Sequence, residues 1–141
     1  MLVKQVSIFV ENTTGRLADV TRILAAHDVD LKAATIADAA DFGILRCIVE
    51  DAEAAKKILN ENGFNASISE VIAVSLKNQP GGFHRVLQIL ADEKIGVKYI
   101  YSTIKSAEGE AVIMMKAADN VKAIEVLKAN DVKLVTIEHV K

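Results

Sequence analysis

The chain has 141 residues, of which 51% are apolar and 26% are charged, and its formal net charge is −2. Because acidic and basic side chains are interspersed, the charge gives no electrostatic footprint for nucleic acid or anionic lipid. No apolar run approaches the roughly 18 residues that a membrane helix requires. The one cysteine, Cys47, cannot form an intramolecular disulfide, so we expect a cytoplasmic protein that binds neither membrane nor nucleic acid.

The first half of the chain is predicted to begin with a strand, a turn and a helix. The aliphatic residues at positions 6, 8 and 10 alternate with Gln5, Ser7 and Phe9, which is the period of a strand with one buried face. The turn Asn12-Thr13-Thr14-Gly15-Arg16-Leu17 follows, and apolar residues then recur at helical spacing up to His27. We expect Thr13 or Thr14 to cap this helix, because a hydroxyl oxygen can accept from its first backbone N–H groups.

A β-hairpin, a helix and a strand are predicted to complete the first half. The hairpin covers residues 31–37 and 43–49, around the turn-like residues 38–41. Asp51 opens an alanine- and lysine-rich helix that ends at Asn62-Gly63. A closing strand then runs from Asn65 to about Ile72.

The second half repeats this order. Residues 72–76 alternate as residues 6–10 do, and Asn78-Gln79-Pro80-Gly81-Gly82-Phe83 repeats the turn, with Asn78 in the place of Asn12. A helix, a hairpin over residues 97–105 and 111–117, a helix opened by Asp119 and a strand over 133–140 are then predicted. Asp119 is the counterpart of Asp51 but stands two positions later than the spacing of the turns predicts. The second copy therefore carries two extra residues in or near its hairpin, where insertions are tolerated.

The order β-α-β-β-α-β in each half predicts the α+β class, with two ferredoxin-like units in tandem at residues 1–70 and 71–141. Each unit is expected to be an antiparallel sheet with its helices on one face. Units of roughly 70 residues bury barely enough surface to be stable alone. We therefore expect the halves to pack against each other or against a second chain, and the chain to form at least a homodimer.

The two glycine turns are candidate sites for small anions. Backbone N–H groups at a helix start are unpaired and carry partial positive charge, and a glycine beside them lets a ligand approach the main chain. An Asn side chain offers both a donor and an acceptor, so it can serve a carboxylate or an ammonium group. The alternative is a plain turn, in which Gly supplies a positive φ and Asn makes a local bond.

A duplicated ferredoxin-like chain with Asn-x-(Thr/Pro)-Gly at its first strand–helix turn resembles the ACT family of amino-acid-sensing regulatory domains. The resemblance covers essentially the whole chain as a tandem pair. It implies that an effector amino acid lies between two ACT units, held by the glycine turn of one and the start of the second strand of its neighbour. The turn positions carried over are Asn12, Thr14, Gly15 and Leu17, and then Asn78, Pro80, Gly81 and Phe83. The second copy matches better, because the family often has Pro where the first copy has Thr14.

Residues around these positions extend the candidate site. Several members of the family use an Asn just ahead of the second strand, where this chain departs from the pattern with Asp30 and Gly96. Asp30 could hold a ligand ammonium, whereas Gly96 could contribute only backbone. Arg16 is a cation at a helix N-terminus, where it either serves an anionic ligand or pairs with Asp19 or Glu11. The candidate ligand-binding residues are Asn12, Thr13, Thr14, Gly15, Arg16, Leu17, Asp30, Leu31, Asn78, Gln79, Pro80, Gly81, Gly82, Phe83, His84 and Val97.

Three other residues are predicted to be structural. Cys47 is expected to be a buried small apolar residue, because it lacks the CxxC partner that metal or redox chemistry would use. His27 is expected to interact with a helix C-terminus, and His139 to lie in the last strand at an edge or interface.

The sequence lacks a nucleophile–base set, a zinc-hydrolase motif and a phosphate loop, so we expect no catalysis, no cofactor and no metal. The resemblance implies a regulatory protein that binds a free L-amino acid and acts on a biosynthetic enzyme partner. The alternative is a regulatory or structural subunit of an amino-acid biosynthetic enzyme, similar to the acetolactate synthase small subunit, without a ligand of its own.

Overall fold

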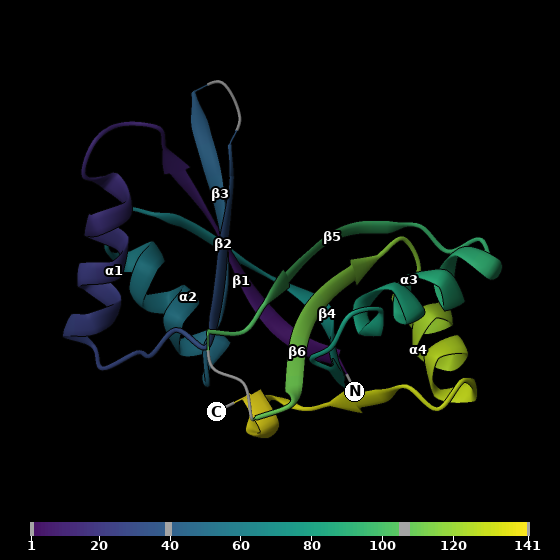
Figure 1. Ribbon diagram of the computed structural model, residues 1–141. Coiled ribbons are helices and arrows are strands. Elements are labelled where there is room, and N and C mark those ends of the chain that lie inside the picture. The colour runs from purple at the N-terminus through teal and green to yellow at the C-terminus, as the bar shows by residue number, and fades with distance from the viewer. Residues whose placement is uncertain (1, 39–40, 105–107, 141) are drawn as a thin grey trace. The chain divides into compact units, whose positions relative to one another are not determined.

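The structure, a computed structural model, describes residues 2–38, 41–104 and 108–140 (Figure 1). Over these residues it has four α-helices, seven strands and a final 3-10 helix, so the predicted α+β class with two ferredoxin-like units is confirmed. The elements are β1 (Leu2–Glu11), α1 (Arg16–Ala26), β2 (Ala33–Asp38), β3 (Phe42–Ile48), α2 (Ala52–Glu61), β4 (Asn65–Lys77), α3 (Gly82–Asp92), β5 (Val97–Ser102), β6 (Glu110–Ala117), α4 (Asn120–Ala129), β7 (Lys133–Val135) and η1 (Ile137–Val140).

The chain folds as two compact units. The first unit is Lys4–Ser69, and the second runs from Glu70 to the end of the chain and includes the start of β1. Strand β4 contributes to both, because it continues without a break from Asn65 to Lys77. The sequence predicts a strand that ends near Ile72 and runs almost directly into the next strand, whereas the structure has a single strand over these residues. No Pro or Gly interrupts residues 65–77, so nothing in the local sequence stops the strand.

Each unit has the strand order expected of a ferredoxin-like fold. In the first unit β2, β3 and β1 pair antiparallel in that order, and β4 follows β1. In the second unit β5, β6, β4 and β7 follow the same order, with antiparallel pairing throughout. The inward faces of these strands pack against α1 and α2 in one unit and α3 and α4 in the other. Helices therefore cover one face of the strands in each unit, and each glycine turn joins the first strand of its unit to a helix.

The caps of α2 and α4 agree with the sequence prediction, and the cap of α1 differs from it. The side chains of Asp51 and Asp119 cap α2 and α4 by accepting from backbone N–H groups, as predicted. The expected capping of α1 by Thr13 or Thr14 is wrong, because the residue at this position is Gly15 with φ 91° and no side-chain cap. Glycine takes this left-handed conformation without the steric cost that Thr would incur.

The end of the chain also differs from the prediction. Strand β7 stops at Val135, and residues 137–140 form a 3-10 helix in which His139 contacts Glu110. His139 is therefore not in a strand. Of the two predicted hairpins, residues Ala39 and Ala40 of the first and Lys105 of the second lie outside the described residues. No helix of the described part of the chain is long and apolar enough to cross a membrane.

Candidate functional site

The two glycine turns share one backbone conformation. Gly15 has φ 91° and ψ −15°, and Gly81 has φ 87° and ψ −12°. The backbone N–H of Asn12 donates to the carbonyl oxygen of Asp41, just ahead of β3, at 3.0 Å. In the same way the backbone N–H of Asn78 donates to the carbonyl oxygen of Gly109, just ahead of β6, at 3.0 Å. The positive φ at both glycines agrees with the plain-turn alternative, so turn shape alone does not distinguish a binding site from a structural turn.

The second turn differs from the first in how closely its backbone approaches the preceding strand. A Cβ atom on Gly82 would collide with the carbonyl oxygen of Lys77, so this position requires glycine. The first unit has Arg16 at the equivalent position. The backbone N–H groups of Phe83 and His84, in the first turn of α3, have no acceptor among the described residues, as expected at a helix start.

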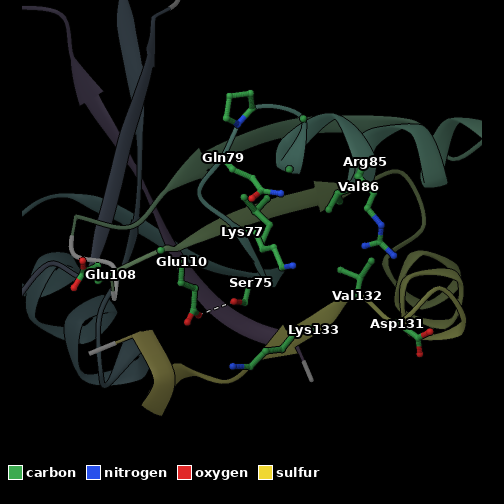
Figure 2. Close-up of a pocket in the computed structure, with 15 residues that line it drawn as sticks. Ser75, Lys77, Gln79, Arg85, Val86, Glu108, Glu110, Asp131, Val132 and Lys133 are labelled. Atoms are coloured by element: carbon green, nitrogen blue, oxygen red, sulfur yellow. Dashed lines mark hydrogen bonds between the residues drawn. The ribbon is translucent and has the colours of Figure 1, made fainter.

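A pocket of about 740 Å³ opens beside the second turn, entirely within the second unit (Figure 2). The end of β4, the turn, the first turns of α3 and the starts of β6 and β7 form its wall. The lining residues are Ser75, Leu76, Lys77, Gln79, Pro80, Gly81, Gly82, Arg85, Val86, Glu108, Gly109, Glu110, Asp131, Val132 and Lys133.

One wall of the pocket holds an ionised carboxylate. The hydroxyl of Ser75 donates to Oε1 of Glu110 at 2.6 Å, and Nε2 of His139 lies 2.7 Å from the same oxygen. These hydrogen bonds, followed by the charges of His139 and Lys133, hold the pKa of Glu110 below its usual value of 4.5 despite partial burial. Glu110 is therefore ionised at neutral pH. Within the described residues its second oxygen, Oε2, accepts no hydrogen bond and can receive a ligand ammonium.

Three cations line the same pocket. Lys77, Arg85 and Lys133 have no carboxylate within 4.0 Å among residues 2–38, 41–104 and 108–140. Arg85 donates from Nη2 to the backbone carbonyl of Asn130 at 2.7 Å, which fixes its head and leaves other N–H donors free. The pocket thus presents both a carboxylate and unpaired cations, the combination that binds a zwitterion.

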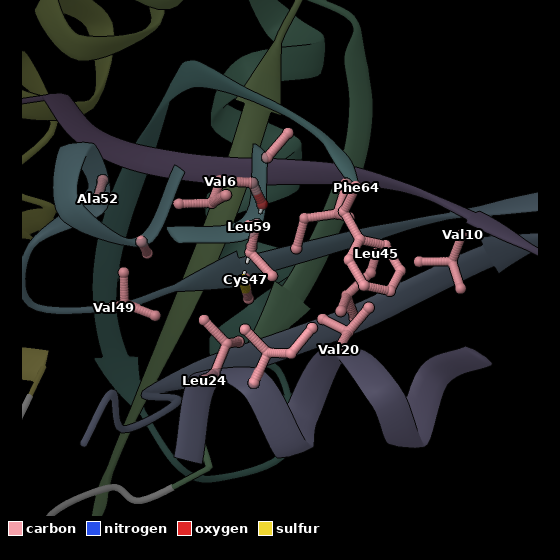
Figure 3. Close-up of a cluster of buried hydrophobic side chains, with 14 residues drawn as sticks. Val6, Val10, Val20, Leu24, Leu45, Cys47, Val49, Ala52, Leu59 and Phe64 are labelled. Carbon is pink, nitrogen blue, oxygen red and sulfur yellow. Dashed lines mark hydrogen bonds between the residues drawn. The ribbon is translucent and has the colours of Figure 1, made fainter. Parts of the chain in front are cut away.

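The first unit has an apolar side chain in the corresponding place. Glu11 lies opposite Phe42 in the first unit as Lys77 lies opposite Glu110 in the second, so the two units can be compared residue by residue. Phe64 stands where the second unit has Val132. Figure 3 shows the ring of Phe64 within the buried cluster of the first unit, near other labelled apolar side chains.

Two more aromatic residues replace the polar pair of the second unit. Phe9 and Phe42 occupy the positions of Ser75 and Glu110, and their ring centroids are 5.4 Å apart. A hydroxyl–carboxylate pair in one unit is therefore an aromatic pair in the other.

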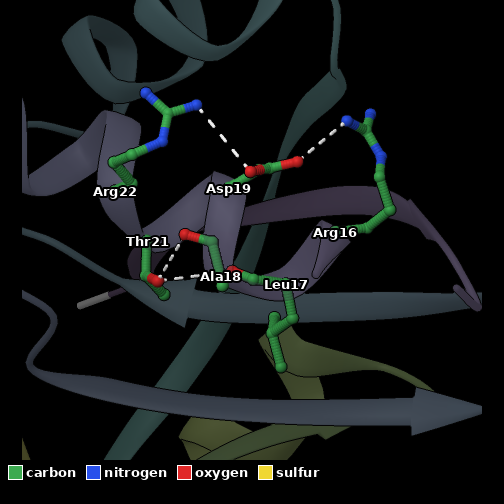
Figure 4. Close-up of polar contacts among 6 residues, drawn as sticks. All are labelled: Arg16, Leu17, Ala18, Asp19, Thr21 and Arg22. Atoms are coloured by element: carbon green, nitrogen blue, oxygen red, sulfur yellow. Dashed lines mark hydrogen bonds and ion pairs between the residues drawn. The ribbon is translucent and has the colours of Figure 1, made fainter. Parts of the chain in front are cut away.

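Arg16 occupies the space beside Phe64. Its guanidinium carbon lies 4.4 Å from the centroid of that ring, and Nη1 lies 3.4 Å from Oδ2 of Asp19 (Figure 4). Its Nε is buried and has no hydrogen-bond partner among the described residues. Of the roles left open by the sequence, the structure shows pairing with Asp19, which also approaches Arg22 at 3.8 Å.

The predicted site residues divide between the two units. Gln79, Pro80, Gly81 and Gly82 line the pocket, whereas Asn78, Phe83, His84 and Val97 are not among its lining residues. Asp30 pairs with Lys32 at 3.1 Å on the surface of the first unit, and Leu31 lies just ahead of β2. Of the other candidates there, Thr13 and Thr14 lie in the turn and Leu17 is exposed in the first turn of α1.

The polar and charged lining of the pocket was not predicted from the sequence, namely Ser75, Lys77, Arg85, Glu110 and Lys133. A comparison of the two copies, aligned on their glycine turns and on the helix-opening residues Asp51 and Asp119, could have found most of it. At two of these positions the second copy has a polar or charged residue where the first copy has an aromatic one.

Cys47 and His27 lie where the sequence predicts them, in the core and at a helix C-terminus. Cys47 is buried, donates weakly to the carbonyl of Val6, and burial raises its pKa to about 12. His27 follows the last turn of α1, where its Nδ1 lies 2.9 Å from the carbonyl oxygen of Ile23. The described residues contain no cluster of three or more side chains that could hold a metal ion.

Comparison with known proteins gives a family and a fold. The family model described as an ACT domain pair matches residues 1–141. Protein BT0572 from Bacteroides thetaiotaomicron is 40% identical, with a TM-score of 0.92 over 99% of this chain and 96% of that one. A search of the curated proteins finds no match.

Two aspartate kinase subunits share the fold at lower identity. The regulatory subunit from Thermus thermophilus, in its ligand-free form, is 16% identical with a TM-score of 0.67, over 91% of this chain and 93% of that one. The regulatory subunit from Thermus flavus is 15% identical with a TM-score of 0.61, over 89% and 90%.

Proposed function

The chain belongs to the ACT domain family as a domain pair, and from this membership and the pocket of its second unit we propose that it is a non-catalytic regulatory protein that senses a free L-amino acid. The observation that carries the proposal is the pairing of opposite charges around one pocket. Glu110 offers Oε2 to an ammonium group, while Arg85, Lys77 and the backbone N–H groups of the turn offer positive charge to a carboxylate.

We assign ligand binding to the second unit and a structural role to the turn of the first. In the first unit Phe64, Phe9 and Phe42 replace the residues that open and charge the pocket, and Arg16 lies over the ring of Phe64. A ligand there would have to displace the buried ring of Phe64 and a guanidinium that is already paired. The candidate residues around Gly15 and Asp30 therefore belong to the fold in this proposal.

Regulation follows if the amino acid changes how the protein associates. We propose that a neighbouring ACT unit completes the site, that the chain is at least a homodimer, and that it acts on a biosynthetic enzyme in the cytoplasm. The structural neighbours named as regulatory subunits of aspartate kinase support a regulatory role, but at 16% and 15% identity they indicate a shared fold rather than a shared partner.

A calorimetric screen of the standard L-amino acids against the purified chain tests this proposal. We expect binding of at least one amino acid, and we expect Val132→Phe to abolish it, because that change fills the pocket as Phe64 fills the first unit. Overpacking costs typically about 1–3 kcal/mol, so circular dichroism must show that the variant folds. If no amino acid binds, the protein is instead a regulatory subunit without its own ligand.

A second variant keeps the test decisive if Val132→Phe does not fold. Ser75→Ala removes the hydroxyl that holds Glu110, and we expect it to weaken binding severalfold. Thr21→Ala is its control, because it removes a hydroxyl from α1 that bonds only backbone carbonyls of its own helix (Figure 4). Equal weakening by the two alanine variants would contradict the assignment of the site.

A further inference from the structure

We infer that the amino acid bound by this pocket has an acidic side chain, as aspartate and glutamate do. This inference rests on the proposed function and goes further by naming the class of ligand. Three cations and one available carboxylate oxygen face the space that the ligand would occupy. Figure 2 shows Lys77 and Arg85 approaching that space from β4 and α3, with Ser75 and Glu110 to one side.

The charges of the pocket exceed what a neutral amino acid can satisfy. An α-ammonium pairs with Glu110, and an α-carboxylate pairs with one cation or with the turn. At least one further cation then remains without a partner in a partly enclosed site, which is unfavourable because like charges repel there. A second carboxylate on the ligand removes this repulsion and adds a charge-assisted hydrogen bond.

The other two acids of the pocket lining form no ion pair with these cations. Glu108 and Asp131 lie at opposite ends of the site in Figure 2, and neither comes within 4.0 Å of Lys77, Arg85 or Lys133. The third acid of the pocket, Glu110, contacts Ser75 and His139 through its Oε1 atom.

The first unit shows that the fold does not require cations at these positions. When the copies are aligned on Gly15 and Gly81, Glu11 and Asp19 occupy the places of Lys77 and Arg85. When they are aligned on Asp51 and Asp119, Asn65 occupies the place of Lys133. All three cations are therefore present only in the unit that has the open pocket, which points to a ligand rather than to the architecture as the reason for them.

Calorimetry with L-aspartate, L-glutamate and their amides, L-asparagine and L-glutamine, tests the inference on the wild-type chain. Each acid differs from its amide by one charge at nearly constant shape. We expect one acid to bind at least about tenfold more tightly than its own amide, because a hydrogen bond between charged groups is stronger than a neutral one. Added salt should reduce this ratio, since it screens charge.

Two lysine variants locate the effect. Lys77→Gln should reduce the ratio of acid to amide affinity toward one, while Lys57→Gln, which removes an exposed charge from α2 of the first unit, should leave the ratio unchanged. If an amide or an apolar amino acid binds as tightly as the acids, this inference is wrong while the proposed function stands. If no amino acid binds at all, both are wrong.

Discussion

Replacing Gly81 with valine tests the assignment of the site with an internal control. Gly81 and Gly15 have nearly the same backbone angles, and a Cβ built on either meets no atom within 4 Å. Neither Gly81→Val nor Gly15→Val therefore causes a steric collision with the rest of the chain. Both variants do carry backbone strain, because a β-branched residue avoids a φ near +90°.

The strain should cost each variant about 1–3 kcal/mol of unfolding free energy. The cost arises although the turn lies at the surface, because the observed φ of 87° at Gly81 lies in the left-handed region. The cost should be nearly equal in the two variants, so it cancels when they are compared. Their difference then reports the effect on ligand binding.

Ligand binding supplies the second magnitude. At a free amino acid concentration of about 100 times its dissociation constant, wild type should gain roughly 2.7 kcal/mol of apparent stability. Gly15→Val should gain the same amount. Gly81→Val should gain almost none, because its side chain projects from a residue that lines the pocket.

Urea unfolding with and without the amino acid found in the screen measures all three gains. Equal ligand-induced gains in Gly81→Val and Gly15→Val would refute the assignment of binding to the second unit. A gain lost in Gly15→Val and kept in Gly81→Val would place the site in the first unit instead.

Cys47, with its pKa raised to about 12, should not react with a thiol reagent at pH 8 until the chain unfolds. Because the pKa of Glu110 is lowered on folding, its contribution to stability is present above pH 4.5 and is lost as the pH falls through the folded value. Glu110→Gln should therefore flatten the acid limb of the curve of unfolding free energy against pH. Asp51→Ala and Asp119→Ala should each cost about 1 kcal/mol in the same unfolding assay, since each removes a helix cap.

Local signals in the sequence predicted most of the fold. The order of elements follows from apolar periodicity, and the caps at Asp51 and Asp119 depend only on residues close by in the chain. The failures have nonlocal or conformational causes. Gly15, in a left-handed conformation, takes the N-cap position of α1 that was predicted for a threonine, and the contact of His139 with Glu110 joins residues that are distant in the chain.

For the same reason, the sequence pointed to only some of the residues that line the pocket. Gln79 to Gly82 could be found from one contiguous motif, whereas Lys77, Glu110 and Lys133 stand at the ends of separate strands. Lys77 ends β4, Glu110 begins β6 opposite it, and Lys133 begins β7 on the other side of β4. Only the pairing of these strands brings the three side chains to one edge of the sheet, and a single strand pattern carries no information on that pairing.

The two units share the same glycine turn but differ in the side chains that lie beside it. In the first unit Arg16 pairs with Asp19 and covers Phe64, so its own side chains satisfy the charge and fill the space near the turn. In the second unit a pocket opens beside the turn, and among the described residues no carboxylate lies within 4.0 Å of its cations Lys77, Arg85 and Lys133. A bound amino acid would supply the missing charge and volume there. Its binding would therefore stabilise the second unit in particular, and the first unit would remain folded whether or not the ligand is present.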